Sequence, residues 1–142
     1  MPNHVEVLLV EDNADDAEMI VRAMAMNNVA GNIRRAKDGA EALEVLFDEM
    51  GKPRLHQLKL ILLDIKLPKV DGIEVLRRIK SDAQAKMVPV VMLTSSNELA
   101  DRRTAYTLGV NSYVVKPMGF DELVETMGLI GRYWLHLNRQ SA

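Results

Sequence analysis

A set of polar residues follows the apolar runs of this sequence. In chain order the set comprises Glu11, Asp12, Asp64, Thr94 and Lys116. Three carboxylates that lie close together repel one another unless a cation or protons intervene. Oxygen ligands suit a hard divalent ion, and Mg²⁺ usually takes one or two carboxylates together with phosphate oxygens. If these residues meet in the folded chain, they could therefore bind Mg²⁺ and act on a phosphate group.

Individual members of the set could take separate parts in phosphoryl transfer. A carboxylate beside the metal ion, such as Asp64, can attack phosphorus and form an aspartyl phosphate, while the ion offsets charge on the moving group. The Thr94 hydroxyl could donate to one phosphoryl oxygen, and the Lys116 ammonium could pair with another. Taken singly, such residues are more often turn residues, helix caps, buried hydroxyls or solvated charges. Only their joint occurrence in this order favours a site for phosphoryl transfer.

The segments that must position this set alternate between apolar runs and amphipathic stretches. We predict strands near residues 5–10, 32–36, 60–63, 90–93 and 112–115, each followed by a helix. Most of these strands are apolar along their whole length, which is typical of a parallel sheet covered on both faces. The expected fold class is α/β: a doubly wound, flavodoxin-like (βα)5 domain with a parallel five-stranded sheet in the order 2-1-3-4-5. Ligands of such sheets bind beyond the carboxyl ends of the strands, where the polar set would share one cleft.

The composition limits the kinds of function. The 142 residues suffice for one domain, and 48% apolar with 27% charged residues are typical of a globular protein with a core. The net charge of -2 offers no basic surface for nucleic acid, and the absence of cysteine excludes disulfides and catalytic thiols. No stretch reaches the roughly 20 apolar residues that span a bilayer, and the first residues do not resemble a signal peptide. We expect a cytoplasmic protein that binds neither nucleic acid nor membranes.

Four short motifs together resemble the receiver domains of response regulators in two-component signalling. They are Val10-Glu11-Asp12-Asn13, Leu63-Asp64-Ile65-Lys66-Leu67-Pro68 continuing to Asp71-Gly72, Leu93-Thr94-Ser95, and Val115-Lys116-Pro117. The resemblance covers roughly residues 5 to 135. It implies the receiver fold, Mg²⁺ as the cofactor, and a phosphorylation-operated switch that takes its phosphoryl group from a sensor histidine kinase.

The resemblance also implies a role for each site residue. Asp64 would be the phosphoacceptor, Asp12 would bind Mg²⁺ directly, and Glu11 would act mainly through metal-bound water. The backbone carbonyl of Lys66 would supply a further metal ligand.

A conformational switch is implied for two positions. Thr94 and Tyr113 match a pair in which the hydroxyl moves toward the phosphoryl group and the aromatic ring turns inward. The alternative for Tyr113 is a half-buried strand residue with no part in switching. The bond between Lys116 and Pro117 matches one that is usually cis in the family.

Five strand–helix units account for the chain to about residues 127–135, so we expect a single receiver domain over residues 1–142, with a core at about 5–127 and no output domain. The last helix should extend over about residues 120–137, roughly 27 Å. It would project beyond strands of only about 17 Å, leaving Trp134 with little of its own domain to pack on. We expect a homodimer or partner surface on the last two helices, including Arg102 and Arg103, and on this extension. The alternative is a cap that folds back on the core.

The segment at residues 51–58 is longer than the connections of about two to six residues that usually precede such a strand. Together with the extended last helix, it is similar to the single-domain response regulators that partner phytochrome-type histidine kinases. The implied partners are a sensor histidine kinase, which could be a bacteriophytochrome, and a downstream protein or histidine phosphotransfer protein.

Three other functions share parts of this pattern. A haloacid-dehalogenase-type phosphatase also uses an Asp nucleophile and Mg²⁺, but it needs a second Asp where this chain has Lys66. A flavodoxin-like flavin binder needs a Ser/Thr/Gly-rich phosphate loop where this chain has Glu11 and Asp12. A degenerate receiver that acts as a scaffold is disfavoured by the complete polar set. We expect a signalling phosphoprotein, not an enzyme, that catalyses only its own phosphorylation and dephosphorylation.

Two side chains distinguish this site: Lys66, two residues after the expected phosphoacceptor, and Ser96, two residues after Thr94. In the family, side chains at these positions flank the path of the water that hydrolyses the acyl phosphate. We expect Lys66 to reach over the phosphoryl group and slow hydrolysis. Lys66→Ala should therefore shorten the lifetime of phosphorylated Asp64, followed as the decay of the phosphorylated mass. An unchanged lifetime would mean that Lys66 points into solvent.

Overall fold

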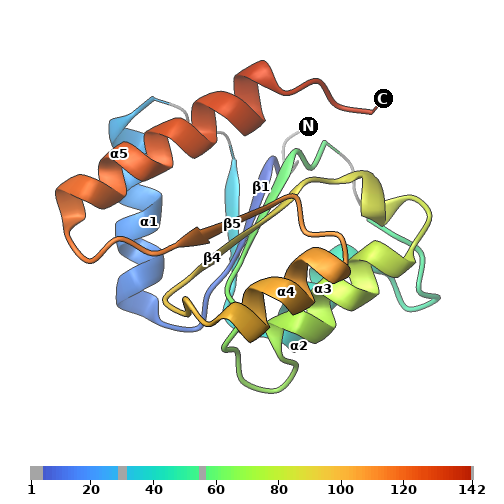
Figure 1. Cartoon of the computed structure of the whole chain (residues 1–142). Coiled ribbons are helices and arrows are strands. Elements are labelled where there is room, and N and C mark those ends of the chain that lie inside the picture. Colours follow the sequence, from blue (N-terminus) through green and yellow to red (C-terminus); the bar gives the residue numbers. More distant parts are fainter. Residues whose placement is uncertain (1–4, 29–31, 55–56, 142) are drawn as a thin grey trace.

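The computed structural model describes residues 5–28, 32–54 and 57–141, and a five-stranded parallel sheet lies at its centre (Figure 1). The strands are β1 (Val7–Val10), β2 (Ile33–Ala36), β3 (Leu60–Leu63), β4 (Val90–Thr94) and β5 (Ser112–Val115). Their order across the sheet is β2-β1-β3-β4-β5, and each neighbouring pair is parallel. The predicted fold class and strand order are confirmed.

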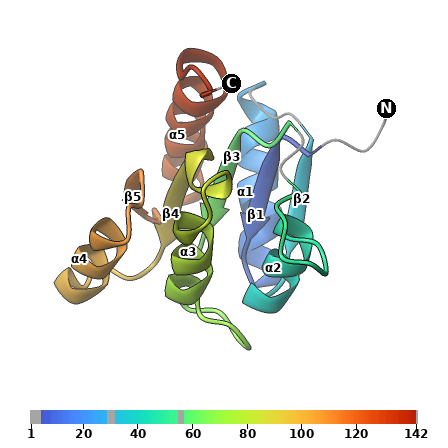
Figure 2. The same ribbon diagram turned by 90° about the vertical axis from the view of Figure 1, so that its right-hand side faces the viewer.

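Helices cover both faces of the sheet. They are α1 (Ala14–Met26), α2 (Gly39–Leu46), α3 (Gly72–Ser81), α4 (Leu99–Thr107) and α5 (Phe120–Gly131), with a 3₁₀ turn η1 (Ala85–Met87) before β4. Figure 1 shows α1 and α5 on one side of the sheet and α2, α3 and α4 on the other, and the turned view in Figure 2 agrees. Across the described residues, no helix combines the length and apolar character needed to cross a membrane.

The central strands are apolar along their length because both of their faces are buried. In β1, Leu8 and Val10 belong to the core under α2, α3 and α4, whereas Val7 and Leu9 belong to the core under α1 and α5. Strands β3 and β4 divide their residues in the same alternating way. Successive side chains of a strand point to opposite faces, so one continuous apolar run supplies two cores.

Three helices begin at a side chain that accepts a hydrogen bond from a backbone N–H of the first turn. Asn13 does so at α1, Asp38 at α2 and Asp71 at α3. The first N–H groups of a helix have no partner within it, so these caps determine where the helix starts after the preceding strand.

The last helix changes type near its end. It continues from Gly131 as a π-helical segment, η2 (Arg132–Leu137), where the Asn138 N–H donates to the Tyr133 carbonyl over 2.6 Å. Glycine lowers helix propensity, and Gly131 lies at this change. Helical structure therefore reaches residue 137, as predicted, although the last part is not an α-helix.

Trp134 does not project away from the domain. It is partly buried and packs, with Leu135, against the core under α1 and α5, and its ring meets the Tyr133 ring edge-on at 4.8 Å between centroids. The prediction that Trp134 has little of its own domain to pack on is therefore wrong. That prediction compared the helix with the strands alone, whereas α5 also packs along α1 (Figure 1).

The long connection before β3 is anchored on α3. Residues 55–56 of the segment singled out from the sequence lie outside the described residues. In the preceding part, Phe47 and Pro53 form an isolated antiparallel bridge. The Arg78 guanidinium of α3 lies 3.8 Å from the centre of the Phe47 ring and donates to the Gly51 carbonyl over 3.2 Å.

Two glycines allow backbone segments to approach closely around the loop after β3. A Cβ added at Gly39 would lie 1.9 Å from the Val70 carbonyl oxygen, and one at Gly72 would lie 2.0 Å from the Asp64 carbonyl oxygen. Neither distance is sterically possible, so only glycine fits at these positions. The loop that follows the predicted phosphoacceptor is thereby held against the starts of α2 and α3.

Gly39→Ala should lower the free energy of unfolding by about 1–3 kcal/mol, the usual cost of forcing an extra methyl group into a packed site. Urea unfolding followed by circular dichroism would measure this change. Gly119→Ala is the control, because a Cβ there would meet the flexible end of Glu122 at 3.2 Å and should have a smaller effect. An unchanged free energy of unfolding for Gly39→Ala would contradict the close packing.

Candidate functional site

The ends of β1 and β3 bring three carboxylates together. Glu11 and Asp12 follow β1, and Asp64 follows β3, its neighbour in the sheet. Each residue offers a carboxylate oxygen, and these three atoms lie within 4.8 Å of one another. Glu11 and Asp64 are buried, whereas Asp12 is exposed. The acidic cluster expected from the sequence therefore forms, and solvent reaches it at Asp12.

Lys116, which follows β5, reaches this cluster from the other half of the sheet. Its Nζ lies 2.5 Å from Glu11 Oε1 and 3.2 Å from Asp64 Oδ2. It also lies 3.2 Å from Asp16 Oδ2, in the first turn of α1. The Lys116 side chain is only 13% exposed, so water and salt screen these pairs weakly. One ammonium thus contacts three carboxylates at once.

Burial and pairing act on these charges in opposite directions. Burial raises the pKa of Glu11, and the hydrogen bond and charge of Lys116 oppose that rise. Burial lowers the pKa of Lys116, but its hydrogen bond to Glu11 and the charges of Asp64 and Glu11 outweigh burial and raise that pKa above its ordinary value. Lys116 therefore stays protonated at neutral pH and serves as the internal counter-ion of the cluster.

The cluster fits a hard divalent cation. Its donors are all carboxylate oxygens, and the four carboxylates, counting Asp16, outnumber the single ammonium. Backbone N–H groups hold the two buried members: Glu11 Oε2 accepts from Asn13 over 3.1 Å, and Asp64 Oδ1 accepts from Ile65 over 2.7 Å. An acidic, partly exposed and preorganised set of oxygen ligands is what Mg²⁺ or Mn²⁺ prefers.

Thr94 ends β4 fully buried and is connected to Tyr113 through Ser96. The Ser96 N–H donates to Thr94 Oγ1 over 3.3 Å, and the Tyr113 hydroxyl donates to the Ser96 carbonyl over 3.0 Å. Ser96 Oγ in turn donates to Asp101 of α4 over 2.5 Å. Tyr113 is half-buried, and this burial raises its pKa. The two residues predicted to switch together are therefore linked to each other and to α4.

Two further expectations concern the loops after β3 and β5. The Lys66 side chain is exposed, and the proposed roles of this side chain and of its backbone carbonyl stay predictions. The described residues contain no cis peptide bond, so the bond between Lys116 and Pro117 is trans. The prediction of a cis bond there is wrong. The two isomers before proline differ by only about 0.5–1 kcal/mol, so the surrounding contacts decide between them and the motif does not.

Two carboxylates of this region are absent from the predicted site. Asp16 pairs with Lys116, and Asp101 with Ser96. Asp16 comes four residues after Asp12, so its spacing could have placed it one helical turn away at the same edge of the sheet. Asp101 carries no comparable signal, because an acid in the first turn of a helix is common for dipole reasons alone.

Comparison with known proteins gives a family match over most of the chain. Residues 7–128 match the family model described as the response regulator receiver domain. The chain is 42% identical over 139 residues to the probable methanogenesis regulatory protein FilR2 of Methanothrix harundinacea, covering 94% of this chain and 85% of that protein.

Two solved structures are similar to nearly the whole chain. The phosphorylated cyanobacterial phytochrome response regulator RcpA is 35% identical with a TM-score of 0.87, and the match covers 99% of this chain and 100% of that one. The Mn²⁺-bound form of the response regulator Rcp1, a protein of Synechocystis, is 32% identical with a TM-score of 0.84, over 98% and 100% of the two chains.

Lys116→Met should bind a divalent cation more tightly than the wild type, because it removes a positive charge from the carboxylates. A unit charge about 4 Å away contributes about 1 kcal/mol even in water, which is roughly a fivefold change in Kd. Titration with Mn²⁺ followed by electron paramagnetic resonance would measure the affinity. Lys69→Met removes a charge that pairs with Asp38 at 3.6 Å and should leave it unchanged. Weaker binding by Lys116→Met would contradict this view of Lys116 as the counter-ion.

Proposed function

This chain belongs to the response regulator receiver family, and we propose that it accepts a phosphoryl group on Asp64, with Mg²⁺, in a two-component relay. The observation that carries the proposal is the cluster of Glu11, Asp12 and Asp64. Lys116 forms ion pairs with two of its members, Glu11 and Asp64. Receiver domains bind a divalent metal, and Rcp1 has been solved with Mn²⁺. Mg²⁺ is the cofactor proposed here because it combines carboxylate and phosphate oxygens in one coordination shell.

The proposed metal ligands are Asp12, Asp64 and the backbone carbonyl of Lys66, with Glu11 acting through metal-bound water. When bound, Mg²⁺ would neutralise charge on the transferring phosphoryl group and hold it in line with the attacking oxygen. The carboxylate oxygens within 4.8 Å of one another support this ligand set.

The remaining residues would act on the phosphoryl group itself. A carboxylate oxygen of Asp64 attacks phosphorus, and the bond between phosphorus and the donor breaks. The Ile65 N–H holds Asp64 Oδ1 over 2.7 Å and so orients the carboxylate. Lys116, 3.2 Å from Oδ2, is close enough to become the charge partner of a phosphoryl oxygen, and the Thr94 hydroxyl would donate to another.

The signal would leave through the surface around α4. A phosphoryl group adds roughly two negative charges. Movement of Thr94 toward it would disturb the hydrogen bond between Thr94 and Ser96. Tyr113 and Asp101 are themselves hydrogen-bonded to Ser96 and would feel this change. Phosphorylation would then bias an existing equilibrium between two arrangements of these residues. Such couplings are typically ~1–3 kcal/mol. Ser96, like Lys66, would also tune hydrolysis of the acyl phosphate.

The proposed phosphodonor is a sensor histidine kinase. RcpA is a phytochrome response regulator, which favours a bacteriophytochrome as the kinase for this chain. The phosphoryl group or the switched surface would then be read by a downstream protein or a histidine phosphotransfer protein in the cytoplasm. A homodimer through α4, α5 and the C-terminal segment is supported by the exposed side chains of Leu129, Tyr133 and Leu137.

We propose a signal carrier that turns over only its own phosphoryl group, and not an enzyme with external substrates. A phosphatase with an Asp nucleophile would need a general acid two residues after Asp64, and Lys66 occupies that position. A scaffold without phosphotransfer would have no need for the buried pairing of Lys116 with Glu11 and Asp64.

Incubation with acetyl phosphate and Mg²⁺ should add one phosphoryl group to the wild-type chain, measured as intact mass. Asp64→Asn should show no adduct, because it lacks the nucleophilic carboxylate, and removal of Mg²⁺ with EDTA should abolish the adduct in the wild type.

Asp71→Asn is the matched control. Asp71 caps α3 outside the cluster, and Asn caps equally well, so this variant should be phosphorylated like the wild type. If acetyl phosphate gives no adduct, a histidine kinase is the second donor to use. Failure with both donors, or an adduct on Asp64→Asn, would contradict the proposed function.

A further inference from the structure

Arg35 of β2 contacts the turn that carries two of the site carboxylates. Its Nε donates to the Glu11 carbonyl oxygen and its Nη2 donates to the Asp12 carbonyl oxygen, each over 3.0 Å. The Arg35 side chain is half-buried. One guanidinium therefore bridges the main chain of both members of the acidic pair.

The position of Arg35 in the sheet makes this bridge possible. Strand β2 lies at the sheet edge beside β1, and Arg35 is opposite Leu9 in the register. The paired part of the two strands ends where the Glu11 N–H donates to the Ala36 carbonyl. The carbonyls of Glu11 and Asp12 lie just beyond this point, and the guanidinium supplies donors that the neighbouring strand no longer supplies.

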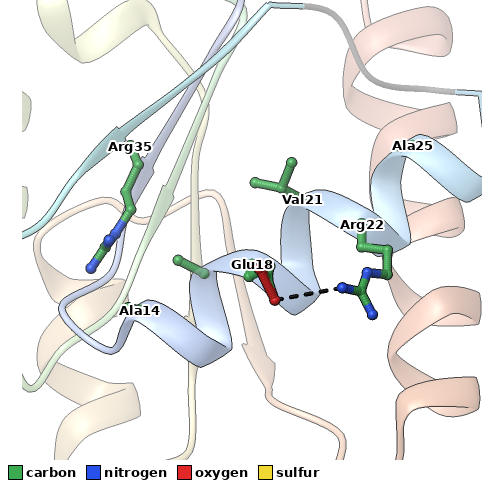
Figure 3. A pocket seen from close by; sticks show the side chains of 7 residues that line it. Ala14, Glu18, Val21, Arg22, Ala25 and Arg35 are labelled. Carbon is green, nitrogen blue, oxygen red and sulfur yellow. Dashed lines mark hydrogen bonds and ion pairs between the residues drawn. The ribbon is translucent and has the colours of Figure 1, made fainter.

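A groove between α1 and β2 gives the side chain its path. Figure 3 shows Arg35 extending from its strand toward Ala14 at the start of α1. The groove is lined there by Ala14 and Ala17, whose small side chains leave room for a guanidinium. Farther along α1, Arg22 lines the same groove but pairs with Glu18 at 3.5 Å (Figure 3).

We propose that Arg35 is a positioning residue for the metal site. The proposal rests on the proposed function, because it requires Glu11 and Asp12 to take part in binding a divalent cation. Ligands must be held to within about 0.5 Å of their productive geometry, and partners behind the ligands usually provide that precision. The Asp12 side chain is exposed, so the main chain beneath it is the part that the fold can hold still. Arg35 holds it from a strand that carries none of the carboxylates.

The contact requires the shape of arginine and not merely its charge. A guanidinium presents its N–H groups in a rigid fork that can span two adjacent carbonyls, whereas a lysine ammonium is a single point on a flexible stem. Arg35→Lys therefore keeps the charge and loses the fork, and Arg35→Met loses both. The two variants separate the effect of geometry from the effect of charge.

Mn²⁺ affinity of the full chain, measured by electron paramagnetic resonance, provides the test. Both variants should bind Mn²⁺ more weakly than the wild type. We expect Kd to rise about 10-fold for Arg35→Met, which has no donor for either carbonyl, and less for Arg35→Lys, whose ammonium can still donate to one of them. Removing a positive charge near carboxylates would by itself tighten cation binding, so a charge effect and a positioning effect have opposite signs. Arg22→Met removes a guanidinium from the same groove and should leave Kd unchanged.

Two further readouts separate positioning from general stability. The Mg²⁺ concentration for half-maximal phosphorylation by acetyl phosphate should rise in Arg35→Met, while the rate at saturating Mg²⁺ stays within about twofold of the wild type. The melting temperature without metal reports any purely structural loss.

Other outcomes would contradict either the positioning role of Arg35 or the proposed function. Unchanged or tighter Mn²⁺ binding by Arg35→Met would overturn the positioning role and leave the proposed function standing. A lower melting temperature with an unchanged Kd would also overturn it, since Arg35 would then be structural only. Absence of Mn²⁺ binding by the wild type would overturn the metal-dependent function itself, and the role of Arg35 with it.

Discussion

The pairing of one ammonium with three carboxylates is the interaction on which the rest of the site depends. Glu11 and Asp64 are buried, and buried carboxylates need a counter-charge. Lys116, which directly follows the carboxyl end of β5, supplies this counter-charge, and its Nζ also contacts Asp16. Because these pairs share one proton-bearing nitrogen, a cation entering the cluster or a phosphoryl group formed on Asp64 must redistribute all of them. A local charge change thereby reaches β1, α1, β3 and β5 together.

The fold allows the cluster to respond to a change in local charge while the strands that carry it stay in place. Parallel strands bring Glu11, Asp64 and Lys116 to one edge of the sheet, while two buried cores hold the strands in register. Gly39 and Gly72 allow the loop after β3 to lie directly against neighbouring backbone. After β4, the hydrogen bonds of Ser96 connect Thr94 and Tyr113 to α4.

Some features of the site could be predicted from the sequence because the sheet topology alone determines where those residues lie. Other features depend on contacts between distant segments, which the sequence pattern does not contain. Residues directly after an apolar strand, such as Asp64 and Lys116, have their place determined by topology, so the cluster and the sheet order followed from the pattern. Side-chain reach is a different matter: the sequence pattern does not indicate that Arg35 reaches forward, past the paired ends of β1 and β2, to two carbonyls. The trans bond before Pro117 and the packing of Trp134 likewise depend on surrounding contacts, which a local motif and a length estimate do not contain.

The most direct test of Asp64 as the phosphoacceptor is the chemical identity of the residue that carries the phosphoryl group. An acyl phosphate is reduced by borohydride to the alcohol, so a phosphorylated aspartate becomes homoserine, which peptide mass spectrometry can locate. After phosphorylation of the wild-type chain by a histidine kinase in the presence of Mg²⁺, we expect homoserine at position 64 and unmodified aspartate at positions 12 and 16. Homoserine at either of those positions, or a phosphoryl group on a histidine or serine, would contradict the central role given to Asp64.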